Sequence, residues 1–560
     1  MSKKNEGVGA LKKHKVGLTS VVALLYCACA GGAFGIEEMI TESGPGVSIL
    51  MLIIIPFVWS IPVCLGVAEL GAILPGEGGP FVWIKEAFGE FWSFLSTFLF
   101  GISFYVGNAV FVVLSVGYLS YIVELTALQA TLIKIFFVIL FTIINIMGVK
   151  EVGKVSIILT VLVIAAFALV TIVGFANWKQ NPLTPVIPED AGVLESVSGC
   201  AAICIWMYTG YLSIPSLAGE IENPQLIPKA TIISLPLVSL TYILPTIAGL
   251  ASVGNWQNWT TDGATGGVGY STVLTQNIGP YMGLFFCIVA IASNLAIFNS
   301  QIAAGSRGFF VLSDANLFPR FMNKVSRKKG VPYICIIVYS AVTLFLLKYD
   351  FTALVLLEVA FSLGTYALVA MSLLRIRKKI PLSQRDPALF KVPGGQFGLK
   401  YCGCAPVAVA AVIMLINGTD YFLGGIMLVP AAVICYILFK RFYGGFYKDD
   451  PALYPINPRT GLAVGDIVRI GVFCLFVGIY SMAAVPFLRW YEGDWGPEYY
   501  AEEYGTGFLS SFDSMLNMLL IYGIIMTVIG AVIFFIGRKK DDPKGGISFY
   551  ETQSKQNTAL

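Results

Sequence analysis

Three glycines, with two glutamates shortly after them, interrupt the first apolar stretch of this 560-residue chain. Residues 16–27 are mainly apolar, and residues 28–38 then read ACAGGAFGIEE. About fifteen helical residues rise roughly 22 Å, which is short of the roughly 30 Å hydrocarbon core of a bilayer. Glycines at that depth release backbone N–H and C=O groups, which a membrane tolerates only where they line a cavity. We therefore predict a small-molecule site at this break, formed by Ala30, Gly31, Gly32, Ala33, Phe34 and Gly35.

A second stretch, IWMYTGYLSIP at residues 205–215, has the same character. Gly210 and Ser213 loosen the turn before Pro215, which removes a backbone donor. The half-helices that end at the two breaks offer carbonyl groups near 29–30 and 208–209, and the half-helix that begins after Gly35 offers N–H groups. Such a site would accept both the ammonium and the carboxylate of an α-amino acid. Its members in the second stretch are Tyr208, Thr209, Gly210 and Tyr211.

Composition indicates which elements must position these residues. The chain is 57% hydrophobic and only 12% charged, against about 25% charged in soluble proteins. Membrane spans need about 20 mainly apolar residues, so we predict an all-α membrane protein. Fourteen spans are expected, near 16–42, 46–72, 91–122, 127–147, 153–174, 194–219, 229–253, 271–305, 331–348, 352–375, 401–416, 419–440, 464–489 and 508–537.

The basic residues predict the orientation of these spans. If the N-terminus is cytoplasmic, only Lys134, Lys179, Lys348 and Arg489 of the 36 Lys and Arg residues fall outside. The others fall in the tails and in alternate loops, as the positive-inside rule requires. We expect a multi-pass protein of the cell membrane with both termini cytoplasmic and the lipid bilayer as its surroundings.

Several functions have no support in the sequence. The net charge of +3 is too small to suggest nucleic acid, and the single histidine, His14, lies in a polar tail. No cluster of His, Asp or Ser suggests an enzyme. Cys402 and Cys404 form a CxC pair without nearby histidines, so no metal and no cofactor are expected. Transport is the leading class. A non-transporting amino acid sensor is the alternative from another class, and the short tails without a folded module argue against it.

Four motifs resemble permeases of the amino acid–polyamine–organocation superfamily, over roughly residues 15–445. The motifs are PFVWSIPVCLGVAELGAILPGEGGPFVWIKEAFG (56–89), SLAGEIENPQLIPKA (216–230), GSRGFFVLSDANLFP followed by GVPY (305–319 and 330–333), and FKVPGG (390–395). Within the family the chain is similar to plant-type polyamine–proton symporters and to bacterial glutamate–GABA antiporters.

The resemblance implies the fold. It is the LeuT-like inverted repeat of five plus five spans, with broken spans one and six and about four further C-terminal spans. The expected division of the chain is a cytoplasmic tail (1–15), a transport core (16–375), spans eleven and twelve (376–440), additional spans thirteen and fourteen (441–537) and a second cytoplasmic tail (538–560).

The resemblance also bears on the substrate. Polyamine carriers of the family place an aspartate before the span-three asparagine and another after the span-six aromatic, where this chain has Gly107 and Leu212. A polycation in a cavity of low dielectric needs such counter-charges. We therefore expect a neutral or zwitterionic amino acid, with a polyamine–proton symporter as the alternative. Some proton-coupled members of the family have a lysine in span five, but the matching residues here, 160–163, read TVLV. Transport could therefore occur by exchange or by coupling to protons through carboxylates.

The fold places further candidate residues beside the breaks. Polyamine-like members keep the first glutamate of the GIEE sequence, so Glu37 is expected to line the cavity. The predicted set also includes four polar residues on the spans that surround the site: Tyr105, Asn108, Asn294 and Asn299. Its last member is Leu212, the apolar residue at a position where polyamine carriers have a carboxylate.

Two carboxylates within spans and one loop complete the sequence-based predictions. Glu69, in span two, is expected to form a structural pair, whereas Glu358, inside span ten, has no role that the resemblance supplies. The loop at 121–129 has no cysteine, so no disulfide-linked heavy subunit is expected.

Overall fold

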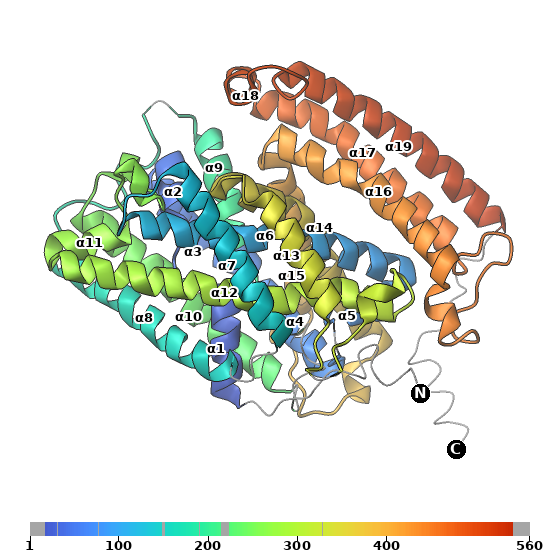
Figure 1. Cartoon of the computed structure of the whole chain (residues 1–560). Coiled ribbons are helices and arrows are strands. Elements are labelled where there is room, and N and C mark those ends of the chain that lie inside the picture. Colours follow the sequence, from blue (N-terminus) through green and yellow to red (C-terminus); the bar gives the residue numbers. More distant parts are fainter. Residues whose placement is uncertain are drawn as a thin grey trace.

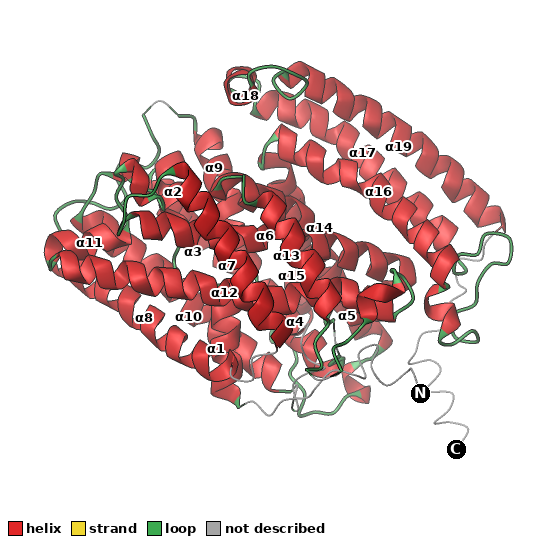
Figure 2. Cartoon of the chain, in the orientation of Figure 1, coloured by secondary structure: helices red, strands yellow, loops and turns green. Residues whose placement is uncertain are grey.

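Helices build the whole of the transport core. The computed structural model describes residues 17–30, 32–76, 78–147, 152–189, 191–213, 215, 223, 225–327 and 329–540. Over these ranges the spans are helical and loops connect them (Figure 2). The helices that form the spans are α1 (Leu18–Cys29), α2 (Ile36–Ser43), α3 (Pro45–Ile55), η3 (Pro56–Ser60), α4 (Ile61–Ile73), α6 (Glu90–Ser120), α7 (Ala127–Met147), α8 (Val152–Ala176), α9 (Val193–Met207), α10 (Leu226–Ser252), α12 (Pro280–Asp314), α13 (Tyr333–Leu346), α14 (Phe351–Lys379), α15 (Gly395–Ile416), α16 (Thr419–Tyr443), α17 (Asp466–Tyr491) and α19 (Phe512–Lys540). The short connecting helices are α5 (Pro80–Phe88), α11 (Tyr270–Asn277) and α18 (Gly496–Tyr504).

The lengths and the apolar surfaces of the helices are those of a multi-pass membrane protein. In the described part of the chain, eleven helices are long and apolar enough to cross a bilayer, and α1, α9 and α13 are shorter apolar helices. Large side chains of α7 such as Leu132, Phe136 and Ile143 are exposed. Lipid tails cover such side chains favourably, which explains apolar residues on the outside of the molecule.

The helices follow the LeuT-like plan of five plus five spans. The first five spans run from α1 to α8, and the second five run from α9 to α14. Helix α1 packs against α8, α10 and α12, whereas α9 packs against α2, α3 and α14. Helix α6 packs along both α12 and α14. The two interrupted spans therefore lie inside the bundle, with α6 and α14 beside them (Figure 1).

The predicted span over 271–305 has very different bounds in the structure. We predicted a single span over 271–305, but α11 ends at Asn277 and α12 begins at Pro280 and continues to Asp314. The prediction was wrong because it read through the Gly279-Pro280 turn, where proline takes the first position of a new helix. The motif at 305–319 therefore begins inside α12.

Four further spans follow the inverted repeat. Helices α15 and α16 contact α14, and α17 and α19 lie alongside each other beside α16 (Figure 1). The α17–α19 pair thus lies at the edge of the molecule, and it meets an interrupted span at the start of α9, where the Tyr491 hydroxyl donates to the carbonyl of Leu194 at 2.7 Å.

Candidate functional site

The first span is broken at its glycines, as predicted. Helix α1 ends at Cys29, and the last N–H group, that of Ala30, bonds to the carbonyl of Tyr26 at 2.8 Å. The chain then turns through Gly32, with φ of +121°, before α2 begins at Ile36. A Cβ atom on Gly32 would lie 2.6 Å from the ring of Phe167, so both the φ angle and the space require glycine. Gly31 lies outside the described residues.

The second break contacts the first. Helix α9 ends at Met207, and Gly210 has a φ of +91°. A Cβ atom at Gly210 would lie 2.6 Å from the carbonyl oxygen of Ala28 and 2.8 Å from Cα of Cys29. The two interruptions are therefore packed backbone against backbone. Residues 216–222 and 224, which carry most of the second family motif, lie outside the described residues.

Two tyrosines join the ends of the broken helices. The hydroxyl of Tyr242, on α10, lies 3.1 Å from the carbonyl oxygen of Cys29 and 2.9 Å from that of Met207, to which it donates. The N–H group of Gly210 donates to the hydroxyl of Tyr366, on α14, at 3.1 Å. The carbonyl ends of α1 and α9 thus meet at one place, and neutral hydroxyls bind them there.

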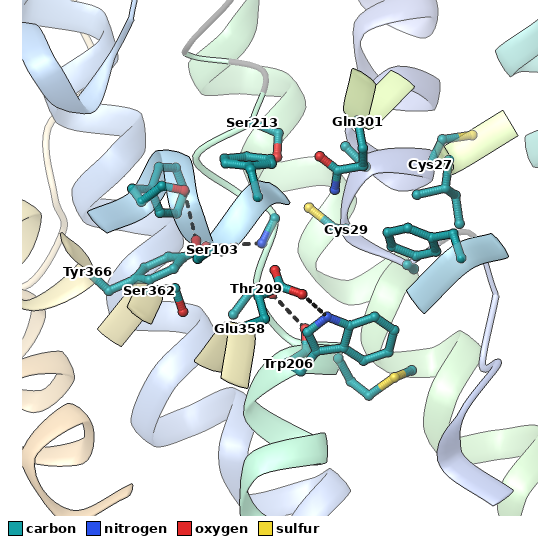
Figure 3. Close-up of a pocket in the computed structure, with 18 of the residues that line it drawn as sticks. Cys27, Cys29, Ser103, Trp206, Thr209, Ser213, Gln301, Glu358, Ser362 and Tyr366 are labelled. Atoms are coloured by element: carbon teal, nitrogen blue, oxygen red, sulfur yellow. Dashed lines mark hydrogen bonds between the residues drawn. The ribbon is translucent and has the colours of Figure 1, made fainter. Parts of the chain in front are cut away.

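A cavity of about 40 Å³ lies at this meeting point (Figure 3). Its wall combines residues of α1, α6, α9, α10, α12 and α14 with residues of the two breaks, and polar side chains come from the helices as well as from the break after α9. The lining residues are Cys27, Ala28, Cys29, Ala30, Phe100, Ser103, Phe104, Phe111, Trp206, Met207, Thr209, Gly210, Ser213, Tyr242, Ile297, Gln301, Glu358, Ser362 and Tyr366.

The electrostatics of this cavity favour a cation. Glu358 is the single carboxylate among the lining residues, which include no Lys, Arg or His. The C-terminal ends of α1 and α9 both point to the cavity, and each helix C-terminus carries about half a negative charge. Among these described groups, the backbone carbonyls and the carboxylate are all hydrogen-bond acceptors, so an ammonium group is the complementary ligand.

Three predicted site residues line the cavity and most of the others do not. Ala30, Thr209 and Gly210 belong to the lining. Ala33 and Phe34 are buried, and the ring of Phe34 packs against aromatic rings at 5.2–6.1 Å. Gly32 and Gly35 shape the turn beside the cavity.

Glu37 does not line the cavity, contrary to the prediction. It is fully buried, and its carboxylate accepts a hydrogen bond from the Tyr118 hydroxyl at 2.6 Å. It also accepts from the N–H group of Gly35 at 3.1 Å. The first turn of α2 directs Glu37 toward α6, and Glu37 therefore occupies the N–H group at Gly35 that we had expected to be available to a substrate carboxylate.

The remaining predicted residues lie in the packing around the site and not in the cavity wall. The Tyr208 hydroxyl donates to the carbonyl of Leu52 at 2.9 Å. Asn299 accepts a hydrogen bond from Asn145 at 2.7 Å, which joins α7 to α12. The others are buried: Tyr105, Asn108, Tyr211, Leu212 and Asn294.

Glu358 is the main residue that the sequence-based prediction missed. Its Oε2 atom accepts a hydrogen bond from the indole N–H of Trp206 at 2.8 Å, and both side chains reach the cavity (Figure 3). The carboxylate covers Gly107, the position whose lack of a carboxylate argued against a polyamine. The spacing of Glu358, Ser362 and Tyr366, four residues apart, is the one local signal that marks this face of α14.

Glu69 forms the structural pair that we predicted. Arg377, on α14, donates to both carboxylate oxygens of Glu69, and Arg385 donates to Oε1 at 2.7 Å. The N–H group of Val392 donates to Oε2 at 2.7 Å. This network fastens the end of α4 to α14 and to the loop that follows it, outside the cavity.

A second, larger cavity of about 730 Å³ lies next to α2. Its ionisable lining groups are five acids and one lysine: Glu38, Glu42, Asp262, Asp350, Glu503 and Lys134. We call this cavity the acidic vestibule. Its charge raises the local concentration of cations.

The fold and the cavity between two broken helices define a membrane transporter, and comparisons with known proteins give its family. The chain belongs to the amino acid permease family, whose model matches residues 16–439. It is therefore a permease of the amino acid–polyamine–organocation superfamily and not an enzyme.

Relatives in plants and bacteria are similar over most of their length. A probable polyamine transporter of Arabidopsis thaliana is 28% identical over 407 residues, which cover 72% of this chain and 80% of the relative. The polyamine transporter PUT1 of Oryza sativa subsp. japonica is 27% identical over 416 residues, 72% of this chain and 74% of the relative. The arginine/ornithine antiporter of Latilactobacillus sakei is 22% identical and covers 84% and 97%.

A solved structure shares the fold. The crystal structure of MhsT in complex with L-phenylalanine aligns with a TM-score of 0.51 at 14% sequence identity, over 73% of this chain and 100% of MhsT.

Proposed function

We propose that this permease carries a small amine-bearing molecule, an amino acid or a polyamine, through the cavity where α1 and α9 end. The observation that supports this most is the contact between the two breaks, in which the Tyr242 hydroxyl lies 3.1 and 2.9 Å from the carbonyls of Cys29 and Met207. Carbonyls at helix C-termini attract positive charge. A substrate ammonium placed there would replace the tyrosine as the donor.

The names of the relatives agree with an amine-bearing substrate. The plant relatives are named polyamine transporters and the bacterial one an arginine/ornithine antiporter. Each of those ligands carries a positively charged nitrogen group, an ammonium or a guanidinium, beyond what a neutral amino acid has. These names favour the polyamine alternative over the neutral amino acid that the sequence motifs suggested.

A neutral amino acid is the second candidate because much of the cavity is apolar. Phe100, Phe104, Phe111 and Ile297 line it. Such side chains would hold an apolar substrate chain, or the methylene groups of a longer amine.

Transport proceeds in this proposal by alternating access. The cavity of about 40 Å³ is far smaller than the roughly 300–1,000 Å³ of typical ligand pockets, so the closed site must widen toward one side of the membrane at a time. We place the termini in the cytoplasm and the protein in the cell membrane, as the distribution of basic residues suggests. The acidic vestibule then opens to the outside and collects cationic solutes.

Uptake into proteoliposomes tests this proposal. The purified protein is reconstituted and offered radiolabelled leucine, arginine, putrescine and spermidine, with protein-free liposomes as the control. We expect saturable uptake of at least one of them. An imposed pH gradient accelerates uptake if transport is proton-coupled, and substrate preloaded inside accelerates it if transport is exchange. Absence of uptake, together with no shift in the unfolding temperature with any of these solutes, would refute the proposal.

A further inference from the structure

We propose that Glu358 recognises a positively charged amine of the substrate, and that Gly107 is the position that makes room for its carboxylate. The proposal rests on the function proposed above, and it assigns to that site a substrate with net positive charge. It also identifies one side chain as the determinant of selectivity between cationic and neutral amines.

Gly107 lies in the centre of the helix face that walls the cavity. Phe100, Ser103, Phe104 and Phe111 all line the cavity from α6. Residues three, four and seven positions apart share one face of a helix, so Gly107 belongs to the same face. Glycine in the interior of a 31-residue helix costs about 1 kcal/mol relative to alanine, and its presence there calls for a reason in the packing.

The carboxylate of Glu358 supplies that reason. A Cβ atom at Gly107 would lie 2.0 Å from Oε2 of Glu358, 2.2 Å from Cδ and 2.7 Å from Oε1. Any side chain at 107 would therefore take the space that the carboxylate now fills. Because position 107 of α6 is glycine, the carboxylate of Glu358 on α14 can lie in the middle of the cavity wall.

One of the two carboxylate oxygens is free to bind a ligand. Oε2 accepts the hydrogen bond from Trp206 at 2.8 Å. For Oε1, no hydrogen bond or ion pair is found among the described residues, and Glu358 is only partly buried because its side chain reaches the cavity. No basic side chain lines the described cavity.

This arrangement is unlike that of two other carboxylates, which are buried and paired with basic side chains of the protein. Glu69 has two arginines and Glu90 has Lys440 at 2.7 Å. A charge buried at low dielectric is stable only when it is paired. Glu358 has only a neutral donor among the described residues, as Glu37 and Glu492 do. Unlike those two glutamates it lines the cavity, beside the C-terminal ends of α1 and α9. A cation from outside the protein can therefore reach it and complete the pair.

Substituting glutamine for Glu358 separates charge from shape. Glu358→Gln keeps the acceptor for Trp206 and the volume of the side chain but removes the charge. We expect the uptake of arginine, putrescine or spermidine, measured as kcat/KM in proteoliposomes, to fall by about 30-fold or more, the usual cost of removing one partner of a buried charge pair. Leucine uptake, if present, should be retained. Glu492→Gln is the matched control, since Glu492 is also a buried glutamate that accepts from neutral hydroxyls, those of Thr419 and Tyr500, and it is not among the lining residues of the cavity.

Moving the carboxylate from one helix to the other tests the role of Gly107. Gly107→Asp should abolish uptake of cations in the wild-type background, because it overlaps Glu358. The double variant Gly107→Asp with Glu358→Ala places a carboxylate at the same point from α6 and should recover most of the cation uptake that Glu358→Ala loses. Gel filtration and thermal unfolding confirm that each variant is folded.

The outcomes distinguish this proposal from the one on which it rests. Cation uptake by Glu358→Gln at the wild-type rate would overturn the assignment, and so would an equal loss of leucine and cation uptake. Wild-type protein that transports leucine but none of the cations would overturn it too, while leaving the permease proposal in place. If the wild type transports none of the four solutes and none shifts its unfolding temperature, the permease proposal fails, and the role of Glu358 fails with it.

Discussion

Replacing Gly210 by alanine should separate the two helix ends that form the cavity. The new Cβ atom would lie 2.6 Å from the carbonyl oxygen of Ala28, and ordinary contact begins at 3.4 Å. The two backbones must therefore move apart by about 0.8 Å, which is 3.4 less 2.6. The left-handed φ of +91° adds a strain of about 1–2 kcal/mol for a residue with a Cβ atom. A displacement of about 1 Å at a reacting or binding site commonly costs about 100-fold, so we expect uptake to fall by about that factor.

The assay is the initial rate of uptake into proteoliposomes, with the unfolding temperature as the measure of structural damage. Gly364→Ala is the matched control because Gly364 lies within a span, on α14, and a Cβ atom there would meet nothing within 4 Å. We expect Gly364→Ala to transport at the wild-type rate and Gly210→Ala to unfold at a slightly lower temperature. Wild-type uptake by Gly210→Ala, or an equal loss in both variants, would refute the reasoning.

Three further variants test other parts of the structure. Gly32→Val should abolish uptake and leave membrane insertion intact, since its Cβ atom would lie 2.6 Å from the Phe167 ring; insertion is checked by fractionation. Arg377→Met removes one of the two arginines that bind the buried Glu69 carboxylate and leaves Arg385 paired with it, so it should lower stability by about 1.5–3 kcal/mol, the usual contribution of a hydrogen bond to a charged group, seen as a lower unfolding temperature in detergent. Burial raises the pKa of Glu492 to about 7, so the folded state binds the proton more tightly than the unfolded state. The resulting stability is present below pH about 4.5 and is lost as the pH rises through 7, and Glu492→Gln should make the unfolding temperature depend less on pH over that window.

The backbone breaks were predictable from the sequence because their causes are local. Glycines at 31, 32 and 35 and the Gly210 turn interrupt apolar runs too short to cross a bilayer. The same local reasoning failed at Gly279-Pro280. This dipeptide is a turn signal that divides residues 271–305 into two helices, but the residues on both sides are apolar and we read them as one span.

The cavity wall was harder to predict because its members come from distant parts of the chain. Gly107 and Glu358 have no sequence relationship, and only their contact in space explains either residue. Glu37 failed as a cavity residue because the rotation of α2 about its axis follows from its packing against α9 and α3 and from the hydrogen bond to Tyr118 on α6, which the sequence of α2 does not encode. Helical spacing predicts which residues of α6 share one face and which residues of α14 share another. It does not predict that these two faces lie opposite each other across the cavity.

The structure of the purified protein with spermidine or arginine bound would show where the substrate lies. We expect ligand density in the cavity between the carbonyls of Cys29 and Met207, with an amine nitrogen at hydrogen-bonding distance from Glu358. Ligand density confined to the acidic vestibule or to another surface, with the cavity between α1 and α9 still closed, would contradict the proposed site.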